Sequence, residues 1–283
     1  MMPRLMIDLK KLRSNTRRIV SMAKKQGMSI TAVTKCCAGS PQVARAMVEG
    51  GASSIGDSRM RNILRMKRAG IDTKFMLLRT PMMSETKKVV EHADISLNSE
   101  LSVIRKLDKE AAKSGRMHEI ILMVEMGDLR EGIEPEKLDG MVSKVTSMDN
   151  IKLLGIGTNL ACFAGVIPTQ KKMNVLTRLA ERIEKDHGIK LKTVSGGNSG
   201  NIPLLVKKKR QGKVDNLRIG EGILLGVETV KRTPVPGMHQ DAFMIEAELI
   251  EVKEKDSLPD GKLGQNAFNQ KREFRDKGRI KHG

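Results

Sequence analysis

The stretch ITAVTK at residues 30–35 is an apolar, β-branched run that ends in a lysine. Residues of this kind favour strands, and a helical pattern follows over 41–49, so we predict a strand that feeds a helix. A lysine that is desolvated at such a strand end loses its proton readily and becomes a nucleophile suited to Schiff-base chemistry. On position alone, Lys35 is better explained as a lysine that packs its stem at the strand end and keeps its ammonium in water.

The same strand-helix unit recurs along the chain. Candidate strands lie at residues 28–34, 53–56, 75–78, 95–97, 120–126, 153–157, 191–194 and 216–219. Helical patterns lie at residues 9–25, 41–49, 59–69, 84–92, 99–114, 135–148, 169–187 and 202–208. Strand-helix alternation predicts a parallel sheet, and this many units in about 230 residues fit a closed (β/α)8 TIM barrel better than an open doubly wound sheet.

The pattern changes at TPVPG, residues 233–237. Residues 242–253 alternate in the manner of a strand, and residues 257–264 are rich in turn formers. We therefore expect a barrel domain over residues 1–233 and a short β-rich domain over residues 234–283. The second segment is too short for a well-buried β domain, so we expect it to be partial, in a chain shortened relative to its relatives.

The chain is strongly basic, with a formal net charge of +19. Lysines and arginines are mixed with acids along the helical patterns, and the densest runs are residues 207–210 and 275–281. With no Trp, no Tyr and five Phe, the chain lacks the aromatic platforms that stack on single-stranded nucleic acid. We therefore expect no nucleic-acid partner, and a basic surface that steers anionic ligands.

The sequence also constrains the compartment. No apolar run approaches the length of a membrane span, and the N-terminus lacks a secretory pattern, so we expect a cytoplasmic protein without a membrane partner. Cys36, Cys37 and Cys162 have no CxxC spacing, which indicates neither a disulfide nor a structural zinc, and we expect no metal. The histidines follow no strand beside a partner and are interpreted as surface residues: His92, His118, His187, His239 and His282.

The residues at the strand ends form a coherent set, because these ends converge on one mouth in a barrel. After the fifth strand comes GDLREG (127–132) with Arg130, and after the sixth comes GTNLAC (157–162). SGGNSG (195–200) follows the seventh strand, and Arg218 lies on the eighth, before GEG (220–222). A glycine-rich loop alone is usually just a turn, but glycine-rich loops after strands seven and eight together indicate a phosphate site.

Arg130 and Arg218 need acceptors if they point into the barrel mouth. Carboxylates such as Asp128, Glu131 or Glu221 would satisfy either arginine alone. A ring nitrogen and a phenolic oxygen are alternative acceptors that account for both arginines at once.

The ordered series of motifs resembles the alanine racemase superfamily of barrel-type pyridoxal phosphate enzymes, and most of all its ornithine-racemase-type members. The resemblance extends from residue 4 to about residue 280. The motifs that carry it are IDL (7–9), AVTK (32–35), DSR (57–59), GDLREGI (127–133), GIGTNL (155–160), SGGNS (195–199) and LRIGE (217–221).

The resemblance implies a homodimeric amino-acid racemase with pyridoxal 5'-phosphate as cofactor, acting on ornithine or another basic amino acid. It implies that Lys35 forms the internal aldimine and is one acid/base, and that Arg218 faces the pyridine nitrogen. An arginine there keeps that nitrogen unprotonated, which favours racemisation over transamination. The remaining cofactor-binding residues that it implies are Arg130 near the phenolic oxygen, Asn159 beside the ring, and Asn198, Ser199, Gly200 and Gly220 for the phosphate.

Inversion at Cα needs a second acid/base on the opposite face, for which the family supplies a tyrosine. This sequence contains no Tyr, and Cys162 is the best substitute within it, because a thiol with a pKa of about 8.5 can exchange protons near neutral pH. The commoner role of such a cysteine is a small buried apolar residue. Cys36 and Cys37 are weaker candidates, because they share the strand end of Lys35.

Two other functions stay open. A non-catalytic pyridoxal phosphate carrier needs the barrel and the lysine but no second base; the lack of Tyr favours it, and the β-patterned end of the chain argues against it. A basic barrel associated with nucleic acid is the third interpretation, which the scattered charges disfavour. For a basic substrate, the conceivable partners of the side-chain ammonium are Asp128, Glu131 and Glu228.

Overall fold

The computed structural model describes residues 2–209 and 211–283, so Arg210 of the basic run lies outside the described residues. The chain divides into two compact units. One comprises Ile7–Phe243, and the other combines the residues up to Met6 with Met244–Gly283.

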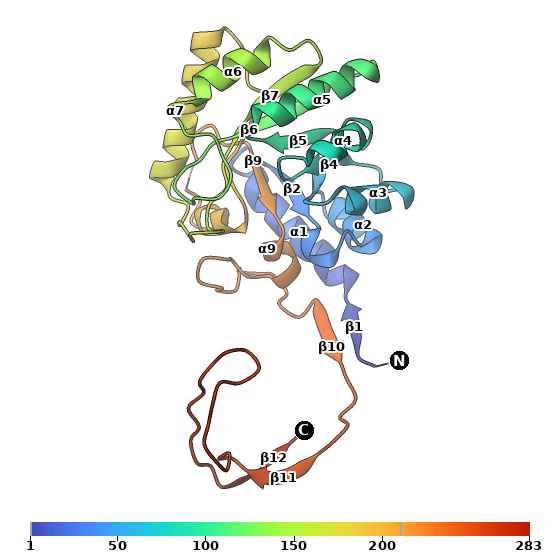
Figure 1. Cartoon of the computed structure of the whole chain (residues 1–283), viewed down its shortest axis with the longest axis vertical. Coiled ribbons are helices and arrows are strands. Elements are labelled where there is room, and N and C mark those ends of the chain that lie inside the picture. The colour runs from blue at the N-terminus through green and yellow to red at the C-terminus, as the bar shows by residue number, and fades with distance from the viewer. Residues whose placement is uncertain (1, 210) are drawn as a thin grey trace. The chain divides into compact units, whose positions relative to one another are not determined.

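The larger unit is the expected (β/α)8 barrel, closed by parallel pairing of its first and last strands (Figure 1). Ile30 pairs with Leu217 and Thr31 with Arg218, which brings the Lys35 strand beside the Arg218 strand. The strands of the barrel, in order, are β2 (Ser29–Val33), β3 (Ser54–Asp57), β4 (Lys74–Leu77), β5 (Ile95–Asn98), β6 (His118–Met123), β7 (Ile151–Gly157), β8 (Thr193–Ser195) and β9 (Asn216–Ile219).

Helices follow the strands and cover the outside of the barrel (Figure 1). Their bounds are α1 (Leu9–Lys24), α2 (Pro41–Glu49), α3 (Met60–Arg68), α4 (Thr86–His92), α5 (Leu101–Lys113), α6 (Leu138–Thr146), α7 (Gln170–His187), α8 (Ile202–Val206) and α9 (Glu221–Leu225). Short 3₁₀ turns lie at η1 (Lys35–Cys37), η2 (Met83–Glu85) and η3 (Ser199–Asn201). Local signals set several helix starts: Asp8 and Thr169 cap α1 and α7 with their side chains, and Pro41 opens α2.

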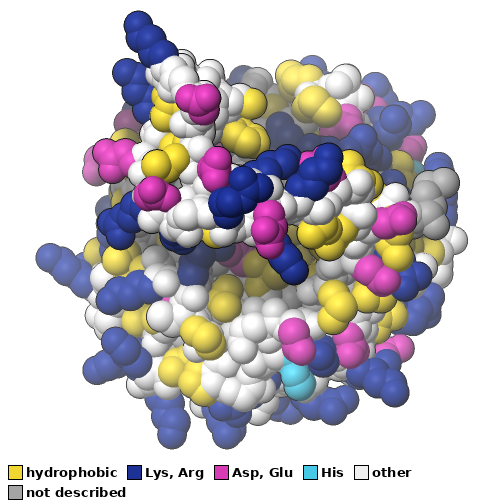
Figure 2. All heavy atoms as spheres, turned by 90° about the horizontal axis from the view of Figure 1, so that it is seen from below, with side chains coloured by type: hydrophobic (Ala, Val, Ile, Leu, Met, Phe, Trp, Pro, Cys, Tyr) yellow, Lys and Arg dark blue, Asp and Glu magenta, His cyan; other side chains and the backbone are white. Residues whose placement is uncertain are grey.

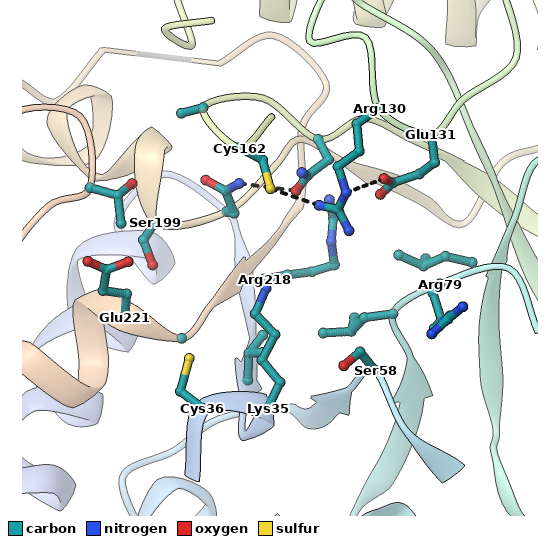
Figure 3. Close-up of a pocket in the computed structure, with 18 of the residues that line it drawn as sticks. Lys35, Cys36, Ser58, Arg79, Arg130, Glu131, Cys162, Ser199, Arg218 and Glu221 are labelled. Carbon is teal, nitrogen blue, oxygen red and sulfur yellow. Dashed lines mark hydrogen bonds and ion pairs between the residues drawn. The ribbon is translucent and has the colours of Figure 1, made fainter. Parts of the chain in front are cut away.

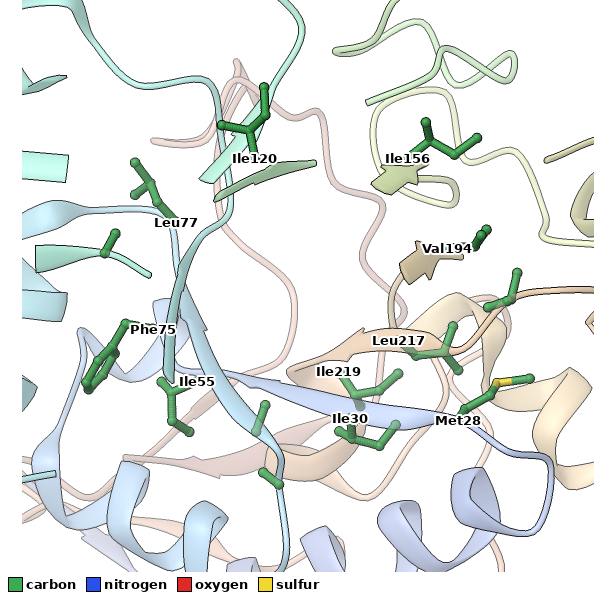
Figure 4. Close-up of a cluster of buried hydrophobic side chains, with 14 of the residues drawn as sticks. Met28, Ile30, Ile55, Phe75, Leu77, Ile120, Ile156, Val194, Leu217 and Ile219 are labelled. Carbon is green, nitrogen blue, oxygen red and sulfur yellow. The ribbon is translucent and has the colours of Figure 1, made fainter. Parts of the chain in front are cut away.

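The core has two layers, because successive strand residues point to opposite sides of the sheet. Side chains such as Ile30, Ile55 and Phe75 pack outward in the large cluster that includes the helices (Figure 4). Met76, which follows Phe75, belongs instead to a second cluster. That cluster fills the barrel interior with Met76, Ile95, Leu97, Ile121 and Met123. Methionine thus supplies core volume in a chain poor in aromatics.

The segment after the barrel contains three further strands, β10 (Phe243–Glu246), β11 (Lys253–Asp256) and β12 (Arg279–His282). β10 pairs with β1 (Arg4–Ile7), and β11 pairs antiparallel with β12. The strand expected over 242–253 is therefore interrupted, and side chains such as Ile245 and Ile250 are 76% and 98% exposed.

Residues 234–243 group with the barrel, beyond the expected boundary at 233. Val235 is buried, and the Asn15 side chain on α1 donates to the backbone oxygen of His239 and accepts from its N–H. That the two units are separate domains stays a prediction. Across the described residues, no helix has the length and apolarity that a membrane span requires. Figure 2 shows lysines and arginines dispersed among acidic and apolar side chains over the face in view.

Candidate functional site

A cavity of about 920 Å³ opens at the carboxyl ends of the barrel strands (Figure 3). Most of the strand-end residues singled out in the sequence line it together. These lining residues are Lys35, Arg130, Asn159, Cys162, Asn198, Ser199, Arg218 and Gly220. Gly200, which lies next to Ser199 in η3, does not line it, and neither do Cys37 and Asp128.

Lys35 begins the 3₁₀ turn that follows β2, and its amine points into the cavity (Figure 3). The turn is fixed by the buried carboxylate of Asp57, which accepts a 2.9 Å hydrogen bond from Thr34 Oγ1. Asp57 also accepts from Arg59 N and Asn62 Nδ2, which explains why the DSR motif belongs to the site. The residue after β2, the end of β3 and the first turn of α3 are thereby tied together close to Lys35.

Lys35 is exposed. The exposure agrees with the interpretation drawn from position alone, and the chain's own residues do not provide the desolvation that the alternative requires. What the protein supplies to Lys35 is a fixed position at the mouth.

The loop after β6 presents Arg130. The Glu125 side chain accepts hydrogen bonds from the backbone N–H groups of Gly127, Leu129 and Arg130, and so folds the loop around one carboxylate. Arg130 Nε pairs with Glu131 Oε2 at 2.5 Å. Burial raises the pKa of the Glu131 carboxyl, although the charges of Arg130 and Arg218 oppose the shift.

The loop after β7 is organised by Asp128, which is 1% exposed. Its carboxylate accepts from the backbone N–H groups of Cys162, Phe163 and Val166 at 2.8–3.4 Å. Asp128 is thus a loop brace, and it pairs with neither arginine. Cys162 is exposed at the cavity wall, where its sulfur accepts a 3.0 Å hydrogen bond from Arg130 Nη1.

Arg218 lies on β9 and is 4% exposed. Its guanidinium donates to the backbone oxygens of Ser195 and Thr158, and to Ser195 Oγ. Burial lowers its pKa to about 10, so the group stays a cation and a hydrogen-bond donor at neutral pH. Within the described ranges, no carboxylate lies at ion-pair distance from it, although the charge of Glu131 favours its protonated form, and its direct partners are neutral oxygens.

The glycine-rich loops after β8 and β9 lie against each other. Ser199 Oγ accepts a 3.1 Å hydrogen bond from Gly222 N, which leaves its own proton free to be donated. A Cβ at Gly220 would lie 3.1 Å from Val33 Cβ, so a side chain there would crowd the end of β2. Asn198 accepts from Gly200 N and donates to Asn159 Oδ1.

The residues fit pyridoxal phosphate. Asn159 Nδ2 is buried without a hydrogen-bond partner among the described residues, and such a donor needs an acceptor. Arg218 brings a buried cation held by neutral oxygens to the cavity wall, where it suits a polar acceptor on a ligand. The groups around the cavity correspond to the parts of this cofactor. The Lys35 amine suits its aldehyde, the Arg218 guanidinium suits its ring nitrogen, and the two glycine-rich loops suit its phosphate.

The other cysteines differ from Cys162. Cys36 lines the cavity and is exposed. Cys37 is partly buried and donates to the backbone oxygen of Thr34, and burial raises the pKa of its thiol to about 11. The thiol is therefore protonated at neutral pH and is a poor base.

His118 does not follow the sequence-based interpretation of the histidines. It begins β6, is 2% exposed, and lies 2.8 Å from Ser96 Oγ through Nε2. Burial lowers its pKa to about 4, so it is neutral at physiological pH. The residue is a neutral core histidine outside the cavity.

Sequence reasoning missed several lining residues, among them Arg79, Thr229 and Arg232. Arg79 directly follows the expected strand 75–78, so the strand-end rule could have found it. Thr229 and Arg232 lie in a loop after α9, for which the sequence carries no comparable signal.

Comparison with known proteins agrees with this geometry. Residues 7–227 match the family model described as alanine racemase, N-terminal domain. The chain is 42% identical over 276 residues to a lysine racemase of Thermotoga maritima, covering 98% of this chain and 77% of that protein. It is 38% identical over 279 residues to an ornithine racemase of Acetoanaerobium sticklandii, covering 98% and 78%.

Solved structures share the fold at lower identity. Alanine racemase from Streptomyces lavendulae matches with a TM-score of 0.75 and 20% identity, over 99% of this chain and 72% of that one. PipY of Synechococcus elongatus, solved with pyridoxal phosphate bound, matches with a TM-score of 0.61 and 18% identity. It covers 74% of this chain and 99% of its own length.

Proposed function

The chain belongs to the alanine racemase family, and from that premise we propose that it racemises a basic amino acid, lysine or ornithine. It is an amino-acid racemase that uses pyridoxal phosphate. The substrate and the roles of individual residues are the proposal. The single observation that supports them most is that the Lys35 amine, the buried Arg218 and two glycine-rich loops line one cavity.

Lys35 is assigned as the residue that attaches the cofactor and moves the proton on one face of Cα. Arg218 would donate to the ring nitrogen, Arg130 to the phenolic oxygen, and Asn159 Nδ2 would find its acceptor beside the ring. The phosphate would be held by Asn198, Ser199, Gly200 and Gly220. Bound pyridoxal phosphate acidifies the Cα–H bond of the attached amino acid by spreading the negative charge into its ring.

Arg218 favours racemisation through its fixed charge. A guanidinium held by backbone oxygens can donate a hydrogen bond but accepts none, so it keeps a neighbouring ring nitrogen unprotonated. A carboxylate in its place would favour protonation of that nitrogen. The proton then returns to Cα, and the amino acid leaves as the same compound or its mirror image.

Cys162 is proposed as the acid/base on the opposite face of Cα. Its sulfur is exposed at the cavity wall and accepts from Arg130 Nη1. A guanidinium is a suitable partner for a sulfur that gives up and regains a proton. The proposal for Cys162 rests on this contact.

Glu131 supports a basic substrate. Of the carboxylates considered from the sequence, Asp128 is committed to the loop after β7, and Glu228 accepts from the backbone N–H groups of Val230, Lys231 and Thr233. Glu131 lines the cavity itself. It is therefore the carboxylate that we assign to the substrate's side-chain ammonium.

A pyridoxal phosphate carrier is the second candidate. PipY matches 74% of this chain over 99% of its own length, and its structure holds pyridoxal phosphate. A protein without a counterpart to the rest of this chain can therefore bind the cofactor. A carrier would bind the cofactor at Lys35 without turnover. The nucleic-acid interpretation has less support, because basic and acidic side chains are interspersed on the face that Figure 2 shows.

The decisive experiment loads the protein with pyridoxal phosphate and follows the visible absorbance band and the optical rotation of L-lysine, L-ornithine and L-alanine. We expect the band to disappear in Lys35→Ala and to persist in Lys88→Ala, whose lysine is exposed on α4. Loss of rotation fastest with lysine or ornithine supports the racemase. An intact absorbance band without turnover of any amino acid would favour the carrier. Binding of DNA without an absorbance band would favour the barrel associated with nucleic acid.

A homodimer and a cytoplasmic location remain predictions. The described cysteines are free, as a reducing compartment requires. Sedimentation of the cofactor-loaded protein tests the dimer, and a monomer at all concentrations would contradict it.

A further inference from the structure

The interior of the barrel has an apolar part and a polar part. Strands β4, β5 and β6 fill it with the apolar cluster of Met76, Ile95, Leu97, Ile121 and Met123. Four adjacent strands, β8, β9, β2 and β3, carry buried polar side chains: Ser195, Asn216, Thr31 and Ser54. The residues next to them in sequence pack in the outer cluster, so these polar side chains point into the interior.

The polar side chains form one chain of hydrogen bonds that starts at Arg218. A guanidinium can only donate, so Ser195 Oγ accepts from Arg218 Nη1. The Ser195 hydroxyl donates in turn to Asn216 Oδ1 at 2.7 Å. Asn216 Nδ2 donates to Thr31 Oγ1 at 3.1 Å, which leaves the Thr31 hydroxyl to donate to Ser54 Oγ at 2.8 Å. Every bond therefore runs in the same direction, away from Arg218.

Packing alone does not account for this chain of hydrogen bonds. Burial of a polar group costs free energy that its hydrogen bonds offset only in part, and the apolar part shows that the same interior can be filled without polar atoms. What the chain does provide is an orientation. Because the Ser195 proton is committed to Asn216, Ser195 presents only lone pairs to Arg218. Bonds aligned in one direction also polarise and strengthen one another.

We propose that Asn216, supported by Thr31, is a positioning residue for Arg218: it fixes the Ser195 hydroxyl and so holds the guanidinium in place beside the cofactor's ring nitrogen. This inference rests on the proposed role of Arg218. In the described part of the chain, Asn216 and Thr31 lie outside the lining of the cavity, so they act through Arg218. Without Asn216, the Ser195 hydroxyl is free to turn its proton towards the guanidinium and displace it. Water can then protonate the ring nitrogen, which favours transamination.

The test measures a ratio within each variant: the amount of 2-oxo acid formed by transamination, with the amino group passing to the cofactor, per molecule of lysine racemised. The ratio does not depend on how much protein is folded or loaded, so a loss of stability alone leaves it unchanged. The visible absorbance band of the cofactor is titrated with pH in parallel.

The variants are Asn216→Leu, Thr31→Val and Thr31→Ser, with Asn98→Leu as the matched control. Asn98 is a fully buried asparagine on β5 that donates to Ser96 and lies outside the chain of hydrogen bonds from Arg218. Its replacement removes the same kind of buried side chain from a barrel strand.

We expect Asn216→Leu to raise the ratio by about tenfold, the usual effect of losing one hydrogen bond to a charged group, and to shift the pH midpoint of the visible band. Thr31→Val should have a smaller effect, because Ser29 Oγ still accepts from Asn216 Nδ2 at 3.2 Å. Thr31→Ser keeps the hydroxyl and should behave as the parent protein. Asn98→Leu should lose stability in urea without a change in the ratio.

An unchanged ratio and an unchanged band in Asn216→Leu would overturn the assignment, as would an equal rise of the ratio in Asn98→Leu. If Asn216→Leu does not fold, the pair Thr31→Val and Thr31→Ser decides in its place, and equal ratios in these two variants would contradict the assignment. A parent protein that binds the cofactor but turns over no amino acid would contradict the proposed function instead. The pH titration of the band would still decide the role of Asn216, because it needs no turnover.

Discussion

Arg130 Nη1 donates to Cys162 Sγ over 3.0 Å, and this contact joins the loop after β6 to the loop after β7. Glu125 accepts from backbone N–H groups of the first loop, and Asp128, which itself lies in the first loop, accepts from backbone N–H groups of the second. The arginine and the thiol are therefore brought together by two loops that Asp128 ties to each other. Their contact predicts that the two residues act on the same part of a bound ligand.

Replacement of Cys162 by serine should lower kcat by about 10²–10⁴-fold, because a hydroxyl exchanges protons poorly near neutral pH. The visible absorbance of the cofactor should persist. In deuterated water, Cα–H exchange should survive for the enantiomer whose proton faces Lys35 and be lost for the other. Cys37→Ser, which changes a thiol that faces Thr34, is the control. Equal exchange of both enantiomers in Cys162→Ser would exclude the thiol as an acid/base.

Asp128→Asn should destabilise the loop after β7. The amide keeps the shape of the side chain but loses one acceptor oxygen, and an N–H group left unsatisfied costs about 1–3 kcal/mol. Urea unfolding should show the loss of stability, and racemisation should slow because Cys162 is displaced. Asp72→Asn, at an exposed position, provides the comparison. Unchanged stability and turnover in Asp128→Asn would mean that the loop holds its form without this carboxylate.

The position of the site could be predicted from the sequence because a barrel brings all its strand ends to one mouth. Knowing that Lys35 ends one strand and that Arg218 lies on another is enough to place them together, and the register of β2 and β9 confirms it. The same rule also applies to Arg79, which directly follows the expected strand 75–78 and lines the cavity.

Features that depend on contacts between distant side chains could not be predicted. Asp128 was one of several carboxylates considered as a partner for an arginine or for a substrate ammonium, yet it bonds to backbone N–H groups as far along the chain as Val166. The sequence left open whether Lys35 is desolvated or keeps its side-chain end in water, because exposure depends on what the neighbouring loops cover. His118 carries no sequence signal that distinguishes it from a surface histidine, because its burial follows from the pairing of β5 with β6.

Glu131→Gln should change the substrate preference. The amide removes the negative charge that we assign to the side-chain ammonium, so kcat/KM for lysine and ornithine should fall by at least about tenfold relative to alanine. The Arg130 ion pair is lost as well, so the ratio between substrates is the informative quantity. Glu134→Gln, which changes an exposed carboxylate paired with Lys137, is the control. A uniform decrease for all three amino acids would assign Glu131 to the positioning of Arg130 alone.

His118 should make the barrel sensitive to acid. Its pKa is about 4 in the folded chain against 6.5 ordinarily, because the imidazole is buried against Ser96. The unfolded chain therefore takes up the proton first as the pH falls, and the stabilisation present above pH 6.5 is lost progressively towards about pH 4. The shift corresponds to about 3 kcal/mol. His118→Gln keeps a polar group for Ser96 but cannot be charged, so its free energy of unfolding should fall less steeply across this range. His92→Gln, on the exposed end of α4, should retain the parent slope, and equal slopes in all three proteins would show that other groups set the acid sensitivity.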